Sequence, residues 1–271
     1  MNLPILYLRL VKFPHVAICM FLCFALSCSN SDMEDPNDVQ DSQEDPTNDG
    51  NGSGGNEESE PNTCTDPGSF IFGEKDGLVS VEFENADFPG DWELKTEEDG
   101  FSGEGYMVWS GTQYLGQPGN GLAQFRIQIE NPGTYQFLWK SAVTIGNSGS
   151  DHNDTWLRFG DADDFFAQNG NSIVYPKGSG KTPHPAGATS DGWFKIYRSG
   201  NDLGFKWQAR TFDNNAHNIF VTFDAPGIYT MEISARSSGH AVDTFVLFKE
   251  PIEQSAAISE SNQPSAITCD N

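Results

Sequence analysis

The chain has 271 residues, a formal net charge of −24 and an aromatic content of 12%. So acidic a chain offers no basic stripe for phosphate groups, which argues against a nucleic-acid partner. Frequent glycine and proline, without long helical patterns, favour an all-β sandwich over a helical enzyme.

The first 27 residues have the pattern of an export signal. Arg9 and Lys12 precede an apolar run over residues 16–26, which is too short to span a bilayer comfortably. The run ends in Ala-Leu-Ser-Cys at 25–28, which resembles a bacterial lipobox. We expect Cys28 to be lipidated and to anchor the mature chain to a membrane. The alternative is an ordinary secretion signal with an incidental cysteine.

Residues 28–66 form an acidic segment that contains no lysine or arginine. It has too little apolar surface to offset its chain entropy, so we expect a disordered tether. Acidic residues directly after a lipidated cysteine resemble the signal that sends some lipoproteins of the Bacteroidetes to the outer face of the outer membrane. The alternative is a solvated linker that contains no sorting signal.

The cysteines outside the signal and the lipobox are Cys64 and Cys269. In an exported protein this remaining pair favours one disulfide that joins the two ends of the folded domain. The alternative is two free thiols in flexible tails.

Residues 67–250 have the pattern of about nine strands, which predicts one jelly-roll β-sandwich. Residues 122–130 alternate for nine positions, and Asn131-Pro132-Gly133 then predicts a turn into a second strand. A similar turn precedes residues 226–248, which we interpret as a closing β-hairpin with Arg236 and His240 at its tip. Residues 144–154 and 161–192 are predicted to be long loops, and 251–271 a polar tail.

The ordered set of strands resembles carbohydrate-binding modules of the galactose-binding-like jelly-roll group, especially families six and thirty-five. The resemblance covers about residues 78–248 and rests on the segments at 81–84, 105–109, 131–135 and 240–248. It implies a structural calcium ion held by Glu82, Glu84 and Asp243, since carboxylate oxygens suit this ion. The alternative is that both glutamates lie on a solvated strand face.

Sugar recognition needs an aromatic face beside polar groups that bind hydroxyls. We predict a ligand site at the loop ends, where the sequence places His152, Asn153, Asp154, Trp193, Arg236 and His240. Trp193 is expected to be the most exposed tryptophan. Further candidates are Trp109, Trp207, Tyr106, Tyr114 and Arg210, although core packing is the alternative for the strand tryptophans.

These patterns together predict a monomeric, surface-tethered lipoprotein of the outer membrane that binds polysaccharide or oligosaccharide without catalysis. The alternatives are a polysaccharide lyase or glycoside hydrolase, for which no carboxylate pair stands in a recognisable catalytic context, and a protein-binding adhesin.

Overall fold

The structure is a computed structural model that describes residues 64–269. The predicted signal peptide, the lipidation site Cys28 and the acidic segment up to residue 63 lie outside the described residues. Within residues 64–269 no helix is long and apolar enough to cross a bilayer.

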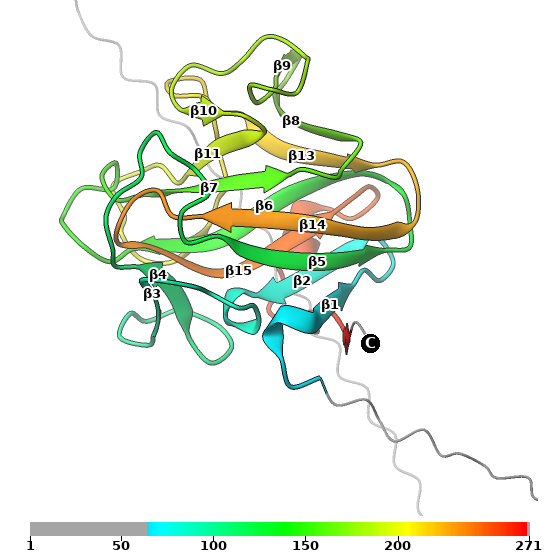
Figure 1. Cartoon of the computed structure of the whole chain (residues 1–271), viewed down its shortest axis with the longest axis horizontal. Coiled ribbons are helices and arrows are strands. Elements are labelled where there is room, and N and C mark those ends of the chain that lie inside the picture. The colour runs from blue at the N-terminus through cyan, green and yellow to red at the C-terminus, as the bar shows by residue number, and fades with distance from the viewer. Residues whose placement is uncertain (1–63, 270–271) are drawn as a thin grey trace, which may run out of the picture. The chain divides into compact units, whose positions relative to one another are not determined.

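The described chain forms two packed β-sheets, which confirms the predicted all-β sandwich (Figure 1). The first sheet has seven strands, in the order β10 (Thr189–Ser190), β11 (Trp193–Tyr197), β7 (Asp154–Phe159), β14 (Gly227–Ser234), β5 (Ala123–Ile129), β1 (Phe70–Gly73) and β16 (Ile267–Cys269). Its β1–β5 pair is parallel, and its other pairs are antiparallel.

The second sheet is antiparallel and has nine strands. Seven of them follow the order β3 (Trp92–Lys95), β4 (Tyr106–Trp109), β15 (His240–Phe248), β6 (Gly133–Val143), β13 (Asn218–Phe223), β8 (Asp164–Asn169) and β9 (Ser172–Val174). In addition, β2 (Leu78–Glu82) pairs with β15, and β12 (Lys206–Trp207) pairs with β6. Three short helical turns complete the domain, η1 (Pro67–Ser69), η2 (Phe83–Asn85) and α1 (Gln254–Ala257).

Aromatic side chains from both sheets fill the space between them. The alternating residues of β5 bury Phe125 and Ile127 completely, as a period of two predicts. Phe125 meets Phe245 of the opposite sheet edge to face, with ring centroids 5.2 Å apart. This continuous core fixes both sheets and so holds the loops at the ends of the sandwich in place.

The predicted closing hairpin is wrong, because its two strands belong to different sheets. Strand β14 pairs with β5 and β7, whereas β15 pairs with β2, β4 and β6. The segment that follows β5 behaves in the same way, since β6 lies in the other sheet. The β5–β6 and β14–β15 connections are therefore arches that cross from one sheet of the sandwich to the other.

Two segments predicted to be irregular contain regular structure. The predicted loop 161–192 includes β8, β9 and the short β10. The predicted polar tail includes α1 and β16, and β16 pairs with β1 in the first sheet. The folded domain therefore extends to Cys269, whose sulfur is joined to that of Cys64 in a disulfide.

Candidate functional site

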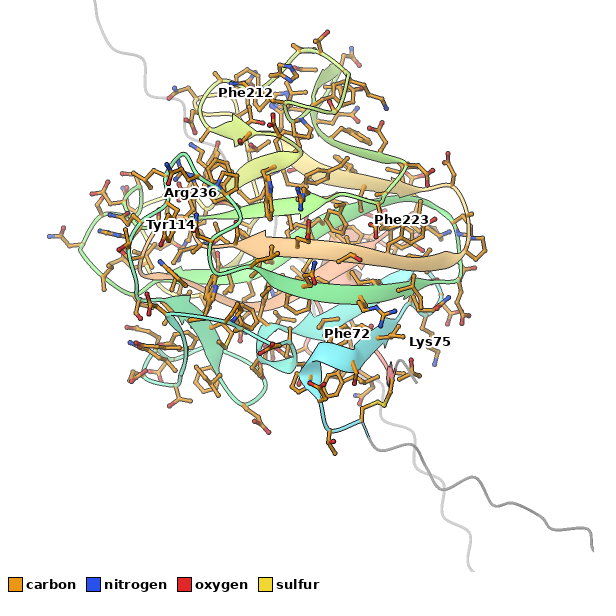
Figure 2. The ribbon with its side chains drawn as sticks, viewed as in Figure 1. Phe72, Lys75, Tyr114, Phe212, Phe223 and Arg236 are labelled. Atoms are coloured by element: carbon orange, nitrogen blue, oxygen red, sulfur yellow. A yellow bond between two sulfur atoms is a disulfide. The ribbon has the colours of Figure 1, made fainter. Side chains whose placement is uncertain are left out.

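A polar cleft of about 940 Å³ lies at one end of the sandwich. Three segments form it: the loop after β6, the end of β11 with the loop that follows it, and the turn after Phe212. Phe212 is labelled in Figure 2. The lining residues are Asn147, Ser148, Gly149, Ser150, Asn153, Asp154, Lys195, Tyr197, Arg198, Ser199, Gly200, Asn201, Asp213, Asn214 and Ala216.

The wall of the cleft depends on a close approach between two of these loops. A Cβ added at Gly149 would lie 1.9 Å from the carbonyl oxygen of Gly200, so a side chain at position 149 would force the loops apart. Position 149 therefore requires glycine, because glycine has no side chain.

Arg198 holds the second loop from beneath. Its side chain is fully buried, and its guanidinium donates to the carbonyl oxygens of Leu203 (2.6 Å) and Asp202 (2.8 Å). Asn153 donates through Nδ2 to the Arg198 carbonyl oxygen at 2.6 Å, which ties the floor of the cleft to β7. These bonds give the loop after β11 a defined shape.

Lys195 and Tyr197 project from β11 into the cleft. The Lys195 ammonium forms an ion pair with Asp213 and lies 5.3 Å from the Tyr197 ring centroid. The Tyr197 hydroxyl donates to the Phe212 carbonyl oxygen at 3.2 Å. Burial is the main reason that the pKa of Tyr197 is raised. The ring is half-buried and presents an aromatic group beside the polar lining.

The structure brings three of the predicted site residues to this region. Asn153 and Asp154 line the cleft. The Asp154 carboxylate is buried and engaged by Arg236 and by the Ser237 hydroxyl. The neighbouring His152 is half-buried, with Nδ1 placed 2.8 Å from the Ser238 carbonyl oxygen. Asn153 and Asp154 therefore shape the cleft through internal bonds.

The other three predicted residues are buried, which corrects their assignment to an exposed rim. Trp193 is only 4% exposed, and the Arg158 guanidinium lies over its ring, 4.6 Å from the centroid. Arg236 pairs with Asp154 and lies beside Tyr114, whose backbone N–H donates to the Arg236 carbonyl oxygen at 2.8 Å (Figure 2). His240 is fully buried at the start of β15.

The further aromatic candidates lie outside the cleft. Trp109 and Tyr106 are buried, and Tyr114 is half-buried against the core. Trp207 lines a separate groove of about 560 Å³ on the second sheet, and Arg210 pairs with Tyr197 through the backbone. None of these residues supplies the lining of the cleft.

Sequence reasoning missed the exposed polar residues of the cleft. Asn147, Ser150, Ser199, Asn201 and Asn214 all have exposed side chains. The available signal was the pair of Asn-, Ser- and Gly-rich turns at 146–150 and 199–204, which mark loops without telling which loops meet in space.

Glu82, Glu84 and Asp243 gather near the bulge of β15, where the register shifts between Val242 and Phe245. Ser102 donates its backbone N–H to Asp243 at 3.0 Å, and the Lys140 ammonium lies 3.0 Å from the same carboxylate. Glu82 accepts hydrogen bonds from the Ser102 and Thr244 hydroxyls.

The same cluster has raised pKa values. Burial is the largest cause in each case, and it raises the pKa of Glu84 to about 7, with the charges of Glu82 and Asp243 adding to the shift. Glu84 accepts a hydrogen bond from the Glu104 backbone N–H at 2.8 Å through Oε1, but its Oε2 is buried without a hydrogen-bond partner. Such an oxygen is costly to bury unless something binds it.

The all-oxygen donor set and the unpartnered Glu84 oxygen fit the chemistry of Ca²⁺. Residues 64–269 contain no group of three His, Cys, Asp or Glu side chains that is arranged to hold a metal ion. Asp243 is also paired with Lys140. Coordination by all three carboxylates would therefore require their side chains to move toward the ion.

No protein-family model matches the sequence, and no curated protein matches it. Among solved structures, the chain is similar to the CBM35 module from Cellvibrio japonicus, with 11% identity, a TM-score of 0.39, and coverage of 72% of this chain and 98% of that one. It is also similar to a CBM6 module of a Zobellia galactanivorans laminarinase, with 12% identity, a TM-score of 0.32, and coverage of 64% and 99%. These modules come from the two families that the sequence resembles.

Some similar structures are larger enzymes. A β-(1,4)-mannanase from Podospora anserina that contains a CBM35 matches with 17% identity and a TM-score of 0.40, over 66% of this chain. This chain spans only 29% of that mannanase and 23% of an isomalto-dextranase from Arthrobacter globiformis.

Proposed function

We propose that the protein is a non-catalytic lipoprotein that binds polysaccharide or oligosaccharide at the cell surface. The observation that carries the proposal is the cleft of about 940 Å³, whose exposed polar side chains are mainly amides and hydroxyls, beside the Asp213 carboxylate and the ring of Tyr197. Amides and hydroxyls bind sugar hydroxyls, and an aromatic ring can cover the apolar face of a sugar.

The state of the carboxylates in the cleft supports binding without catalysis. Asp154 is engaged by Arg236 and Ser237, and Asp213 is paired with Lys195. A glycoside hydrolase usually needs one carboxyl group that donates a proton and a second that acts as base or nucleophile. In this cleft the carboxylates of Asp154 and Asp213 are both engaged by side chains of the protein itself.

Affinity gel electrophoresis against a panel of polysaccharides tests this function. We expect retardation in at least one gel, with no change in the chain length of the polymer. Asn201→Ala should weaken the retardation, whereas Asn171→Ala, an exposed position outside the cleft, should leave it unchanged. Release of reducing ends or unsaturated sugars would show an enzyme, and failure to bind any glycan, with or without calcium, would favour an adhesin.

Anchoring through Cys28 is part of the proposal and rests on the lipobox-like tetrad at 25–28 and the acidic segment after it. Mass spectrometry of the membrane fraction should find acyl chains on Cys28. Cys28→Ala should move the protein to the soluble fraction. Protease treatment of intact cells should digest the wild-type protein if it faces outward, and full protection would place it on the inner leaflet.

We also propose that calcium stabilises the fold at Glu82, Glu84 and Asp243. The unpartnered oxygen of Glu84 and the raised pKa values of the three carboxyls support this site. A bound Ca²⁺ would neutralise negative charge on the carboxylates of Glu82, Glu84 and Asp243, and it would join η2 to β15.

A further inference from the structure

The charged side chains that line the cleft balance one another. Lys195 and Arg198 are the cations of the lining, and Asp154 and Asp213 are its anions. The net formal charge of the lining is therefore zero, in a chain whose total charge is −24.

Each of these cations already has a carboxylate partner. The Lys195 ammonium pairs with Asp213, and its side chain is only 11% exposed. Arg198 lies 3.2 Å from the Asp202 carboxylate, and its side chain is not exposed at all. A ligand carboxylate or sulfate would have to displace Asp213 to reach a cation in this cleft.

Apart from the Asp213 carboxylate, whose side chain is 39% exposed, the polar groups that remain accessible in the cleft are neutral. Asn147, Asn201 and Asn214 present amides, and Ser150 and Ser199 present hydroxyls, on side chains that are exposed. Amides and hydroxyls both donate and accept hydrogen bonds, as sugar hydroxyls do. An anionic ligand that lost water here would gain no compensating charge, and burying such a charge is unfavourable.

We propose that the cleft selects neutral, hydroxyl-rich saccharides over carboxylated or sulfated ones. The inference rests on the proposed glycan-binding function, and it adds the chemical class of the ligand. It further assigns Asp213 as the residue that enforces the selection, because Asp213 keeps the Lys195 ammonium from a ligand.

Calorimetric titration tests the selection with neutral xylo-, manno- and gluco-oligosaccharides on one side and oligogalacturonate and sulfated galactan fragments on the other. We expect binding of at least one neutral oligosaccharide, with a Kd that changes less than about twofold between roughly 20 mM and 500 mM NaCl, because screening affects only charge–charge attraction. We expect no comparable binding of the anionic fragments.

The Asp213→Asn variant tests the role of the ion pair. Loss of the carboxylate leaves Lys195 without its partner, so we expect the variant to gain salt-sensitive binding of oligogalacturonate. The matched control is Asp87→Asn, which removes an exposed carboxylate outside the cleft. If Asp213→Asn unfolds, the selection is still decided by the wild-type protein, through its affinities for neutral and anionic oligosaccharides at the two salt concentrations.

The outcomes separate the two claims. Tighter, salt-sensitive binding of an anionic fragment by the wild-type protein would overturn the selection and leave glycan binding intact. Absence of binding to both classes would overturn the glycan-binding function, and the selection with it.

Discussion

His240 is a fully buried imidazole between the two sheets. Thr155 Oγ1 lies 2.8 Å from its Nδ1, and the Trp139 ring meets it edge to face at 5.4 Å. Burial, with the nearby positive charge of Arg198, lowers the pKa of His240 to about 3. The side chain is therefore neutral at physiological pH and has a structural role.

The first prediction concerns the loss of stability at low pH that the buried His240 causes. The folded state resists protonation of His240 while the unfolded state accepts a proton below about pH 6.5, so the stability from this residue is lost as pH falls from about 6.5 toward 3. The loss is at most about 1.4 kcal/mol per pH unit. The His240→Asn variant has no imidazole at this position, so its free energy of unfolding lacks this pH-dependent contribution. The difference in unfolding free energy between wild type and variant should shrink as the pH falls, as measured by urea titration.

A difference between wild type and His240→Asn that stays constant from pH 7 to pH 4 would contradict the account.

The second prediction concerns Gly149, where the two loops of the cleft wall touch. Gly149→Ala introduces a Cβ that overlaps the Gly200 carbonyl oxygen, so the loops must separate. We expect at least a tenfold loss of glycan affinity, a binding free energy change of about 1.4 kcal/mol or more. Gly170→Ala is a control for glycine loss, because no atom lies within 4 Å of its Cβ position, although its positive φ adds local strain. Unchanged affinity in Gly149→Ala would mean that the wall does not bind ligand.

At the scale of elements, alternation predicted the strands but not their partners. β5 and β13 follow the apolar pattern closely, because each buries one face in the core. The Pro-Gly turns predicted hairpins and instead begin arches. A turn of this composition fits both connections, and only the packing of the two sheets decides between them.

Of the residues predicted for the ligand site, Asn153 and Asp154 line the candidate cleft, which is formed by loops. Trp193, Arg236 and His240 are buried instead. Trp193 follows Asp191-Gly192 and so resembles an exposed loop residue. It is covered by Arg158, whose position 35 residues earlier in the sequence gives no local sign of the contact. Residues that meet only through tertiary contacts cannot be paired from a single sequence.

The third prediction concerns the carboxylate cluster between η2 and β15. If calcium binds there, EDTA should lower the Tm of the wild-type protein, because it removes a ligand that binds only the folded state and leaves the Lys140 ammonium as the cation beside the three carboxylates. Glu84→Gln should weaken this response, and Asp243→Ala should lower the Tm as EDTA does. Differential scanning fluorimetry provides the measurement. Equal melting of the wild type with and without chelator would remove calcium from the account.

At the scale of the whole molecule, the disulfide joins the first described residue to the last. Cys64 and Cys269 are 205 positions apart in sequence, and β16 pairs with β1 beside the bond. The bond therefore closes the folded domain and limits the freedom of the unfolded chain.

The fourth prediction concerns this closure. A loop of this length gives an entropic stabilisation on the order of 5 kcal/mol in the chain-entropy model. Reduction should therefore lower the Tm by about 10 °C. A Cys64→Ser, Cys269→Ser double variant should melt at the lower temperature with or without reductant. A reduced wild type that melts at the same temperature as the oxidised protein would show that pairing of β16 with β1 suffices.

The position of the bound glycan tests the central claim most directly. Backbone amide chemical shifts of the purified protein should be followed during titration with an oligosaccharide that the gel screen has identified. They should change mainly at the residues that line the cleft, which are 147–150, 153–154, 195, 197–201, 213–214 and 216. Shift changes confined to other surfaces, such as the groove beside Trp207, would contradict a glycan site in this cleft.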